Sequence, residues 1–137
     1  MNNFETGDRL LQEAREFLPE LERAFDRGSW NIVVRRAQEI VELSLKGALK
    51  MMGIEYPKEN DVGDVFAQAC TARNLGVEEA ELGAVRGISA RLARERQPSF
   101  YMERQYSREE AMRAREGTEK VLALVGRLAE RMRGSRP

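Results

Sequence analysis

The sequence of 137 residues contains no histidine and one cysteine, Cys70. Without histidine the chain lacks the most common general base, the most common zinc ligand and every Ser-His or Cys-His catalytic pair. A single cysteine cannot form an intrachain disulfide, and no nearby residue would activate Cys70, so we expect it to be a small core residue. The ordinary catalytic motifs are therefore missing, and we expect neither a metal site nor a cofactor.

Long apolar runs and glycine-rich phosphate loops are also missing. No apolar run approaches the roughly 18 residues that a membrane-spanning helix needs, and the N-terminus has no signal-peptide pattern. The glycines are scattered and form neither a Walker nor a Rossmann loop. Charged residues make up 34% and hydrophobic residues 42% of the chain, a composition typical of a globular domain. We expect one cytoplasmic domain without membrane contact.

The net charge is zero, but the charges are distributed unevenly. From Arg86 to Pro137 there are thirteen Lys and Arg residues against seven Asp and Glu residues, whereas residues 1–85 hold ten against sixteen. Two interpretations remain open. The basic part could bind an anionic partner, or the two parts could neutralise each other inside the fold.

The segment from Trp30 to Gly53 is expected to be the central helix. Its apolar residues recur at steps of three and four, which is typical of one buried helix face. Ser29 is a favourable N-cap residue and Gly53 is a favourable residue just past the C-terminus. Because a helix of this length cannot bury its apolar face alone, we expect the other helices to cover it.

The other periodic stretches predict helices over residues 2–26, 62–73, 78–96 and from 108 to about 132. Pro19 should bend the first of these or split it near Leu18. Residues 97–106 are expected to be irregular, and Ser107 with Glu110 forms a capping box for the last helix. The sequence predicts an all-α, up-and-down four-helix bundle with one additional short helix, forming a single domain over residues 1–133 with a frayed tail at 134–137.

Arginines and aromatic residues alternate around the end of the fourth long helix. This combination suits pairing with phosphate and stacking with bases, so it is the candidate nucleotide-binding or phosphate-binding site. The alternative is a solvated arginine face, with Phe100 and Tyr101 anchoring the loop to the core. The candidate binding residues are Arg91, Arg94, Arg96, Tyr101, Arg104 and Tyr106.

Two parts of the chain resemble the HEPN domain family, named for higher eukaryotes and prokaryotes nucleotide-binding. The first part comprises Ala37-Gln38-Glu39, Glu42, Leu45-Lys46, Leu49, Gly53, Pro57 and Asp61-Val62-Gly63-Asp64. The second comprises Arg96 to Tyr101, Tyr106, Ser107 and Glu109-Glu110-Ala111. The resemblance extends over roughly residues 8 to 130 and depends on the order and spacing of these motifs together.

The resemblance implies a helical bundle that pairs into a homodimer and binds nucleotide or RNA. Many members are metal-independent ribonucleases with an arginine followed closely by a histidine at the dimer cleft. Here Arg96 matches the arginine, Tyr101 falls five residues later, and Asn60 stands where a loop histidine is common. Arg96 and Tyr101 are thus the candidate catalytic residues, but a tyrosine with a pKa of ~10 is a poor base at neutral pH. We therefore expect binding with little or no catalysis.

Two alternatives remain. Some members of the family partner a minimal nucleotidyltransferase, as in toxin–antitoxin pairs, so the chain could be an interaction subunit for such an enzyme. The chain could also be a ribonuclease with a rearranged, histidine-free site, in which Glu95 or Glu103 acts as the base and Tyr101 as the acid.

Overall fold

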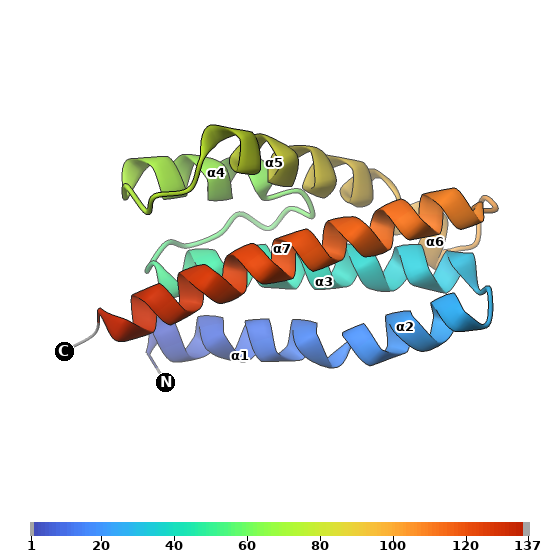
Figure 1. The fold of residues 1–137 in the computed structure, drawn as a ribbon, viewed down its shortest axis with the longest axis horizontal. Coiled ribbons are helices and arrows are strands. Elements are labelled where there is room, and N and C mark those ends of the chain that lie inside the picture. The colour runs from blue at the N-terminus through green and yellow to red at the C-terminus, as the bar shows by residue number, and fades with distance from the viewer. Residues whose placement is uncertain (1, 136–137) are drawn as a thin grey trace.

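The computed structural model describes residues 2–135, and this part of the chain is a bundle of helices without strands (Figure 1). The all-α prediction is confirmed, although two short helices, α4 and α6, accompany the long ones rather than one. The helices are α1 (Asn3–Glu16), α2 (Leu18–Asp26), α3 (Trp30–Met51), α4 (Gly63–Ala72), α5 (Glu79–Arg94), α6 (Arg96–Phe100) and α7 (Arg108–Gly134).

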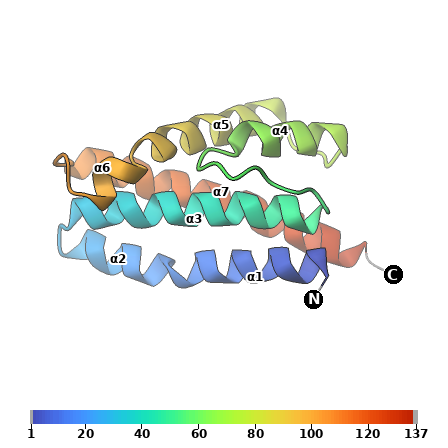
Figure 2. The same ribbon diagram turned by 180° about the vertical axis from the view of Figure 1, so that it is seen from behind.

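Helix α3 is the centre of the bundle, as its apolar periodicity predicts. It packs against α1 and α2 on one side and against α5 and α7 on the other (Figures 1 and 2). Ile40, Leu45 and Leu49 are fully buried on it. Gly53 has a φ of +78° and allows the amide of Ile54 to donate to the carbonyl of Leu49 at 2.9 Å, which closes the helix end.

Ser29 precedes α3 as predicted, but its side chain makes no capping hydrogen bond to the helix. Its hydroxyl oxygen instead accepts a hydrogen bond from the Nε of Arg27 at 3.1 Å. The start of α3 therefore depends on the apolar packing of the helix rather than on a side-chain cap.

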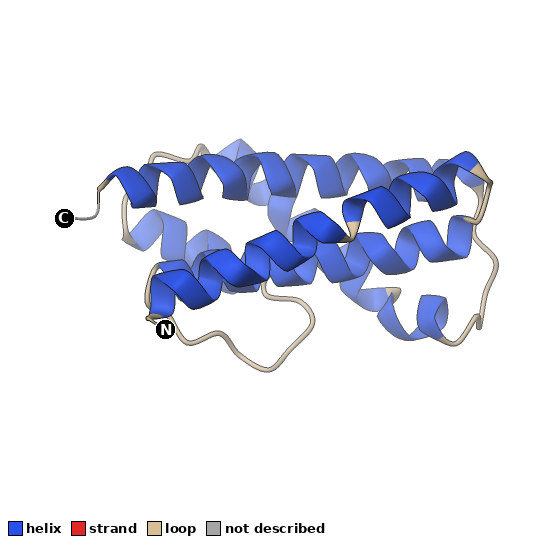
Figure 3. Ribbon diagram, turned by 90° about the horizontal axis from the view of Figure 1, so that it is seen from below, coloured by secondary structure: helices blue, strands red, loops and turns tan. Residues whose placement is uncertain are grey.

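The first helical stretch is divided at Phe17, next to the position where the sequence predicts a break. Helices α1 and α2 lie end to end, with a short interruption between them (Figure 3). Pro19 falls in the first turn of α2, where a missing backbone N–H costs no hydrogen bond. The division lets both pieces follow the surface of α3.

The loop between α3 and α4 is fixed to α5 by Asp61. One carboxylate oxygen of Asp61 accepts from the hydroxyl of Ser89 at 2.7 Å and from the amide of Gly63 at 3.1 Å. Arg86 on α5 donates to Asp64 at 3.1 Å. These contacts hold the preceding residue, Asn60, beside the C-terminal half of α5.

Helix α7 runs through Gly134, with Ser135 as its C-cap, so the helix extends into the segment predicted to be a frayed tail. Residues 136 and 137 of that segment lie outside the described residues. None of the helices within residues 2–135 is long and apolar enough to cross a membrane.

Candidate functional site

The candidate site lies where α5 ends and α6 begins. The sequence predicts an irregular segment after a helix that ends near Arg96, but α5 ends at Arg94 and residues 96–100 form α6. The prediction of irregular structure is wrong there because Pro98 stands in the first turn of α6, where proline is tolerated. The side chain of Asn31 holds α6 against α3 by donating to the carbonyl of Ser99 at 2.7 Å.

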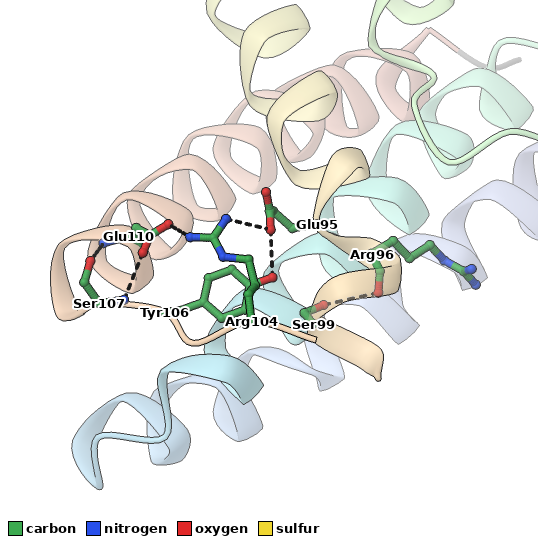
Figure 4. A network of polar contacts seen from close by, with 7 residues as sticks. All are labelled: Glu95, Arg96, Ser99, Arg104, Tyr106, Ser107 and Glu110. Carbon is green, nitrogen blue, oxygen red and sulfur yellow. Dashed lines mark hydrogen bonds and ion pairs between the residues drawn. The ribbon is translucent and has the colours of Figure 1, made fainter. Parts of the chain in front are cut away.

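Two of the predicted binding residues, Arg104 and Tyr106, have side chains that bind carboxylates of the protein itself. The hydroxyl of Tyr106 donates to Glu95 at 2.7 Å, and only 8% of Tyr106 is exposed. Arg104 lies between Glu95, at 3.1 Å, and Glu110, as Figure 4 shows. The same Glu110 completes the predicted capping box with Ser107, which is confirmed.

These contacts alter the ionisation of the groups involved. Burial, followed by the hydrogen bond to Glu95, raises the pKa of Tyr106 well above its ordinary value. The backbone amide of Ser107, together with Arg104, lowers the pKa of Glu110. The hydrogen bond to Glu110 is the main reason that the pKa of Arg104 is raised. Glu95, Arg104, Tyr106 and Glu110 therefore form an internal network, which we call the junction network, that ties α5 to α7.

Arg94 is the last residue of α5, and Arg96 is the first residue of α6. They line a surface hollow of about 440 Å³, together with Asn60, Gln97 and Glu103. Both arginines are exposed, and neither makes an ion pair with a described carboxylate. Figure 4 shows the guanidinium of Arg96 pointing away from the junction network. We call this feature the arginine hollow; it is large enough for a nucleotide-sized group and contains two unpaired cations.

Arg91 lies on the flank of α5 that faces α7, where it lines a cleft of about 50 Å³ with Arg113, Glu95, Tyr106 and Glu110. We call this feature the α5–α7 cleft. Burial, then the nearby charges of Arg113 and Arg94, lower the pKa of Arg91. No described carboxylate forms an ion pair with Arg91 or Arg113.

Tyr101 does not line the arginine hollow with Arg96. It caps α6 and stands edge-on against Phe100, with ring centroids 4.9 Å apart. The exposed fractions of Phe100, Tyr101 and Met102 are 51%, 66% and 75%. The guanidinium of Arg35 on α3 lies over the ring of Phe100, 4.2 Å from its centroid. Phe100, Tyr101 and Met102 thus form an exposed apolar tip, and the guanidinium of Arg35 packs on the ring of Phe100. Tyr101 is not anchored in the core.

The family model of the HEPN domain matches residues 8–128, which is most of the chain. The chain belongs to the HEPN domain family. This HEPN domain is therefore a member of a nucleotide-binding and ribonuclease-type family, in which dimers are common. Comparison with curated proteins gives no match, and comparison with solved structures gives none.

The interpretation that the two parts of the chain neutralise each other holds for four arginines of this HEPN domain, whereas binding of an anionic partner stays a prediction. Arg86, Arg115, Arg127 and Arg133 each pair with a carboxylate of the acidic part, namely Asp64, Glu22, Glu81 and Asp8. By contrast Arg91, Arg94, Arg96 and Arg113 have no such partner and gather around the end of α5. Sequence reasoning missed Arg113 because nothing in its local pattern shows that α7 brings it beside Arg91.

Within residues 2–135 no cluster of three or more His, Cys, Asp or Glu side chains could hold a metal ion. Cys70 is buried, as predicted, and burial raises the pKa of its thiol to about 11. A buried thiol that stays protonated is a core residue rather than a nucleophile.

Proposed function

We propose that this HEPN domain binds nucleotide or RNA phosphate in the arginine hollow, as part of a homodimer and with little or no catalysis. The observation that supports binding most directly is the pair Arg94 and Arg96, exposed in a hollow of about 440 Å³ and without carboxylate partners. Unpaired guanidinium groups match phosphate oxygens in geometry and charge. Asn60 and Gln97 add amide donors to the same hollow.

The expectation of weak catalysis rests on proton transfer. Cleavage through a 2′-hydroxyl needs a base and an acid, and loss of such help typically lowers the rate by a factor of about 10² to 10⁴. Tyr101 stands outside the arginine hollow, and Glu95 already accepts hydrogen bonds from Tyr106 and Arg104. Only Glu103 lines the hollow as a carboxylate, so the alternative of a histidine-free ribonuclease depends on Glu103.

A second candidate function is that of an interaction subunit for a minimal nucleotidyltransferase, as in toxin–antitoxin pairs. The exposed tip formed by Phe100, Tyr101 and Met102 favours this reading, because contiguous exposed apolar side chains often mark protein interfaces. Recovery of a nucleotidyltransferase with the protein from its native host, lost on Tyr101→Ser, would support this function. Recovery of the homodimer alone would count against it.

The test of the proposed function is a metal-free assay of labelled single-stranded RNA, with binding and cleavage read on one gel. We expect Arg96→Ala to weaken RNA binding about tenfold and to reduce its dependence on salt. The matched control is Arg9→Ala, which removes an exposed arginine from α1, away from the hollow. Equal binding by both variants would refute the proposal.

Cleavage would be tested in the same assay with Glu103→Gln. Binding without cleavage in the unaltered protein is the expected result. Cleavage that Glu103→Gln abolishes, while binding persists, would favour the ribonuclease alternative. Light scattering at micromolar concentration tests the homodimer separately, and a monomer would remove the dimer from the proposal.

A further inference from the structure

A separate pocket of about 670 Å³ lies at the end of the bundle where α1 begins and α7 ends (Figure 1). The C-terminal ends of α3 and α4 contribute to the same pocket. Helix α6, which lines the arginine hollow, packs against the start of α3, and α3 is about 33 Å long. We call this feature the terminal pocket. It shares no lining residue with the arginine hollow.

The wall of the terminal pocket is mostly apolar. Its apolar residues come from four separate segments and are Phe4, Met51, Met52, Leu75 and Met132. Met51 and Met52, only 8% and 6% exposed, are the most deeply buried of them, and the other three are partly buried. Half of the six methionines of the chain meet here, and flexible thioether side chains adapt to apolar ligands of different shapes. The volume falls within the range of small-molecule sites, roughly 300–1,000 Å³.

Two arginines, Arg73 and Arg131, line the same pocket, and no acidic residue does. Within residues 2–135, Arg73 makes neither an ion pair nor a side-chain hydrogen bond. Arg131 donates to the carbonyl of Leu75 and has no carboxylate partner in the described part of the chain. Arg133, the third arginine at this end, differs because it pairs with Asp8. The terminal pocket thus combines an apolar wall with two positive charges that no carboxylate compensates.

The helix C-termini at this end of the bundle carry partial negative charges, which oppose an anion. Hydrogen bonds already use part of their carbonyl groups. The amide of Ile54 closes α3, and the amide of Leu75 donates to the carbonyl of Cys70 in α4 at 3.1 Å. Arg131 binds one further carbonyl. Two whole guanidinium charges beside apolar surface therefore favour an anion over a cation.

We propose that the terminal pocket binds a fatty-acid-like molecule, a single apolar chain that carries a carboxylate. The chain lies against the methionine-rich wall and the carboxylate pairs with Arg73. Of the two arginines, Arg73 keeps all of its donors free, and one guanidinium matches one carboxylate in a bidentate pair. Arg131 adds positive charge nearby. This site is independent of the arginine hollow, so the proposed function can stand or fail without it.

The experiment follows the ¹³C-labelled methyl groups of the methionines by NMR during a titration with decanoate. Decyl maltoside and decyltrimethylammonium carry the same chain on a neutral and a cationic head group, and all three are kept below their critical micelle concentrations. We expect decanoate to shift the methyl signals of Met51, Met52 and Met132. The signal of Met102, in the exposed tip, should not move. Decanoate should bind about tenfold more tightly than either control, as expected for a charge-assisted hydrogen bond.

Arg73→Gln tests the contact with the carboxylate. Because Arg73 is exposed and has no internal partner among the described residues, the variant should fold normally. We expect it to weaken decanoate binding roughly tenfold and to leave binding of decyl maltoside unchanged. The matched control is Arg23→Gln, which removes an exposed, unpaired arginine from α2 at the other end of the bundle and should change neither affinity.

Each of the other results would overturn the inference. Equal affinity for decanoate and decyl maltoside, or an Arg73→Gln variant that behaves like Arg23→Gln, would show that no carboxylate contact forms. Tighter binding of decyltrimethylammonium would show that the helix C-termini determine the charge preference. A shift of Met102 in place of the other three methionines would place the chain on the exposed tip. AMP that shifts the three signals as strongly as decanoate would identify a nucleotide site. RNA binding in the arginine hollow is measured separately, so none of these results bears on the proposed function.

Discussion

Replacing Tyr106 with phenylalanine distinguishes the two roles that this residue could have. The sequence places Tyr106 among candidate ligand residues, whereas the structure buries it and directs its hydroxyl to Glu95 at 2.7 Å. If the structural role is the only one, Tyr106→Phe should reduce stability while leaving RNA affinity unchanged. If Tyr106 contacts the ligand, RNA affinity should fall at a temperature at which the variant is fully folded.

The size of the stability change follows from the hydrogen bond that is lost. Hydrogen bonds to charged acceptors contribute about 1.5 to 3 kcal/mol. Glu95 retains its contact with Arg104, and 22% of its side chain is exposed, so water can replace part of the lost bond. We therefore expect Tyr106→Phe to lower the free energy of unfolding by about 1.5 kcal/mol at pH 7, at the low end of that range.

The contribution of Tyr106 should disappear at alkaline pH. Its pKa is raised in the folded state, so the folded protein keeps the phenolic proton at pH values where the unfolded chain, with a pKa near 10, releases it. The stabilisation is thus fully present below pH 10 and is lost as the pH rises above it. At pH 11 the loss is up to about 1.4 kcal/mol, which would make the original protein and the variant nearly equal.

Urea unfolding of the two proteins at pH 7 and pH 11 measures this convergence directly. Other groups that titrate in this range, Cys70 included, are present in both proteins, so their effects cancel in the difference. Tyr101→Phe is the matched control, because Tyr101 is 66% exposed and makes no side-chain hydrogen bond among the described residues. A difference at pH 7 that persists unchanged at pH 11 would refute the linkage argument, and no difference at pH 7 would refute the hydrogen-bond argument.

Three further substitutions test how the bundle is held together. In Gly7→Ala the new Cβ would clash with the carbonyl oxygen of Gly47 and would lie 2.7 Å from the amide nitrogen of Met51. We therefore expect the free energy of unfolding, measured with urea, to fall by about 1–2 kcal/mol, although alanine has the better helix propensity. Gly83→Ala, with no atom within 4 Å of the new Cβ, should instead stabilise by about 0.5–1 kcal/mol, and equal effects would contradict the packing argument. Ser107→Ala removes the hydroxyl that accepts a hydrogen bond from the amide of Glu110, and should lower the free energy of unfolding by about 1 kcal/mol. An unchanged midpoint of urea unfolding would argue against the cap.

Local sequence patterns predicted those helices and helix ends that are determined by residues close in sequence. Apolar periodicity predicted α3, Pro19 predicted the break between α1 and α2, and Ser107 with Glu110 predicted the start of α7. Each signal acts within a few residues of the feature that it predicts, through backbone hydrogen bonds or the spacing of one helix face. Such features can be predicted before any tertiary contact is known.

The candidate site was predicted only in part because its contacts are distant in sequence. Arg94, Arg96 and Asn60 do come together, but Tyr106 turns inward to Glu95, eleven residues earlier, and Arg104 is drawn to the same carboxylate. An arginine or tyrosine in a loop is compatible with both a ligand contact and an internal contact. Which one forms depends on where a carboxylate lies in three dimensions, and the local pattern does not show this.

The ion pairs of the described residues divide the arginines of the second half of the chain into a paired and an unpaired group. Arginines paired with carboxylates elsewhere in the bundle already have much of their charge compensated, and exposed pairs of this kind contribute little to stability. Arg91 and Arg113 lack this compensation, because Arg104 holds the two carboxylates that line the α5–α7 cleft with them, Glu95 and Glu110. Arg104 therefore leaves the charges of Arg91 and Arg113 unpaired, while its own contacts with Glu95 and Glu110 tie α5 to α7. Replacing Arg104 would free these two carboxylates to pair with Arg91 and Arg113, and would thereby lower the positive charge of the α5–α7 cleft.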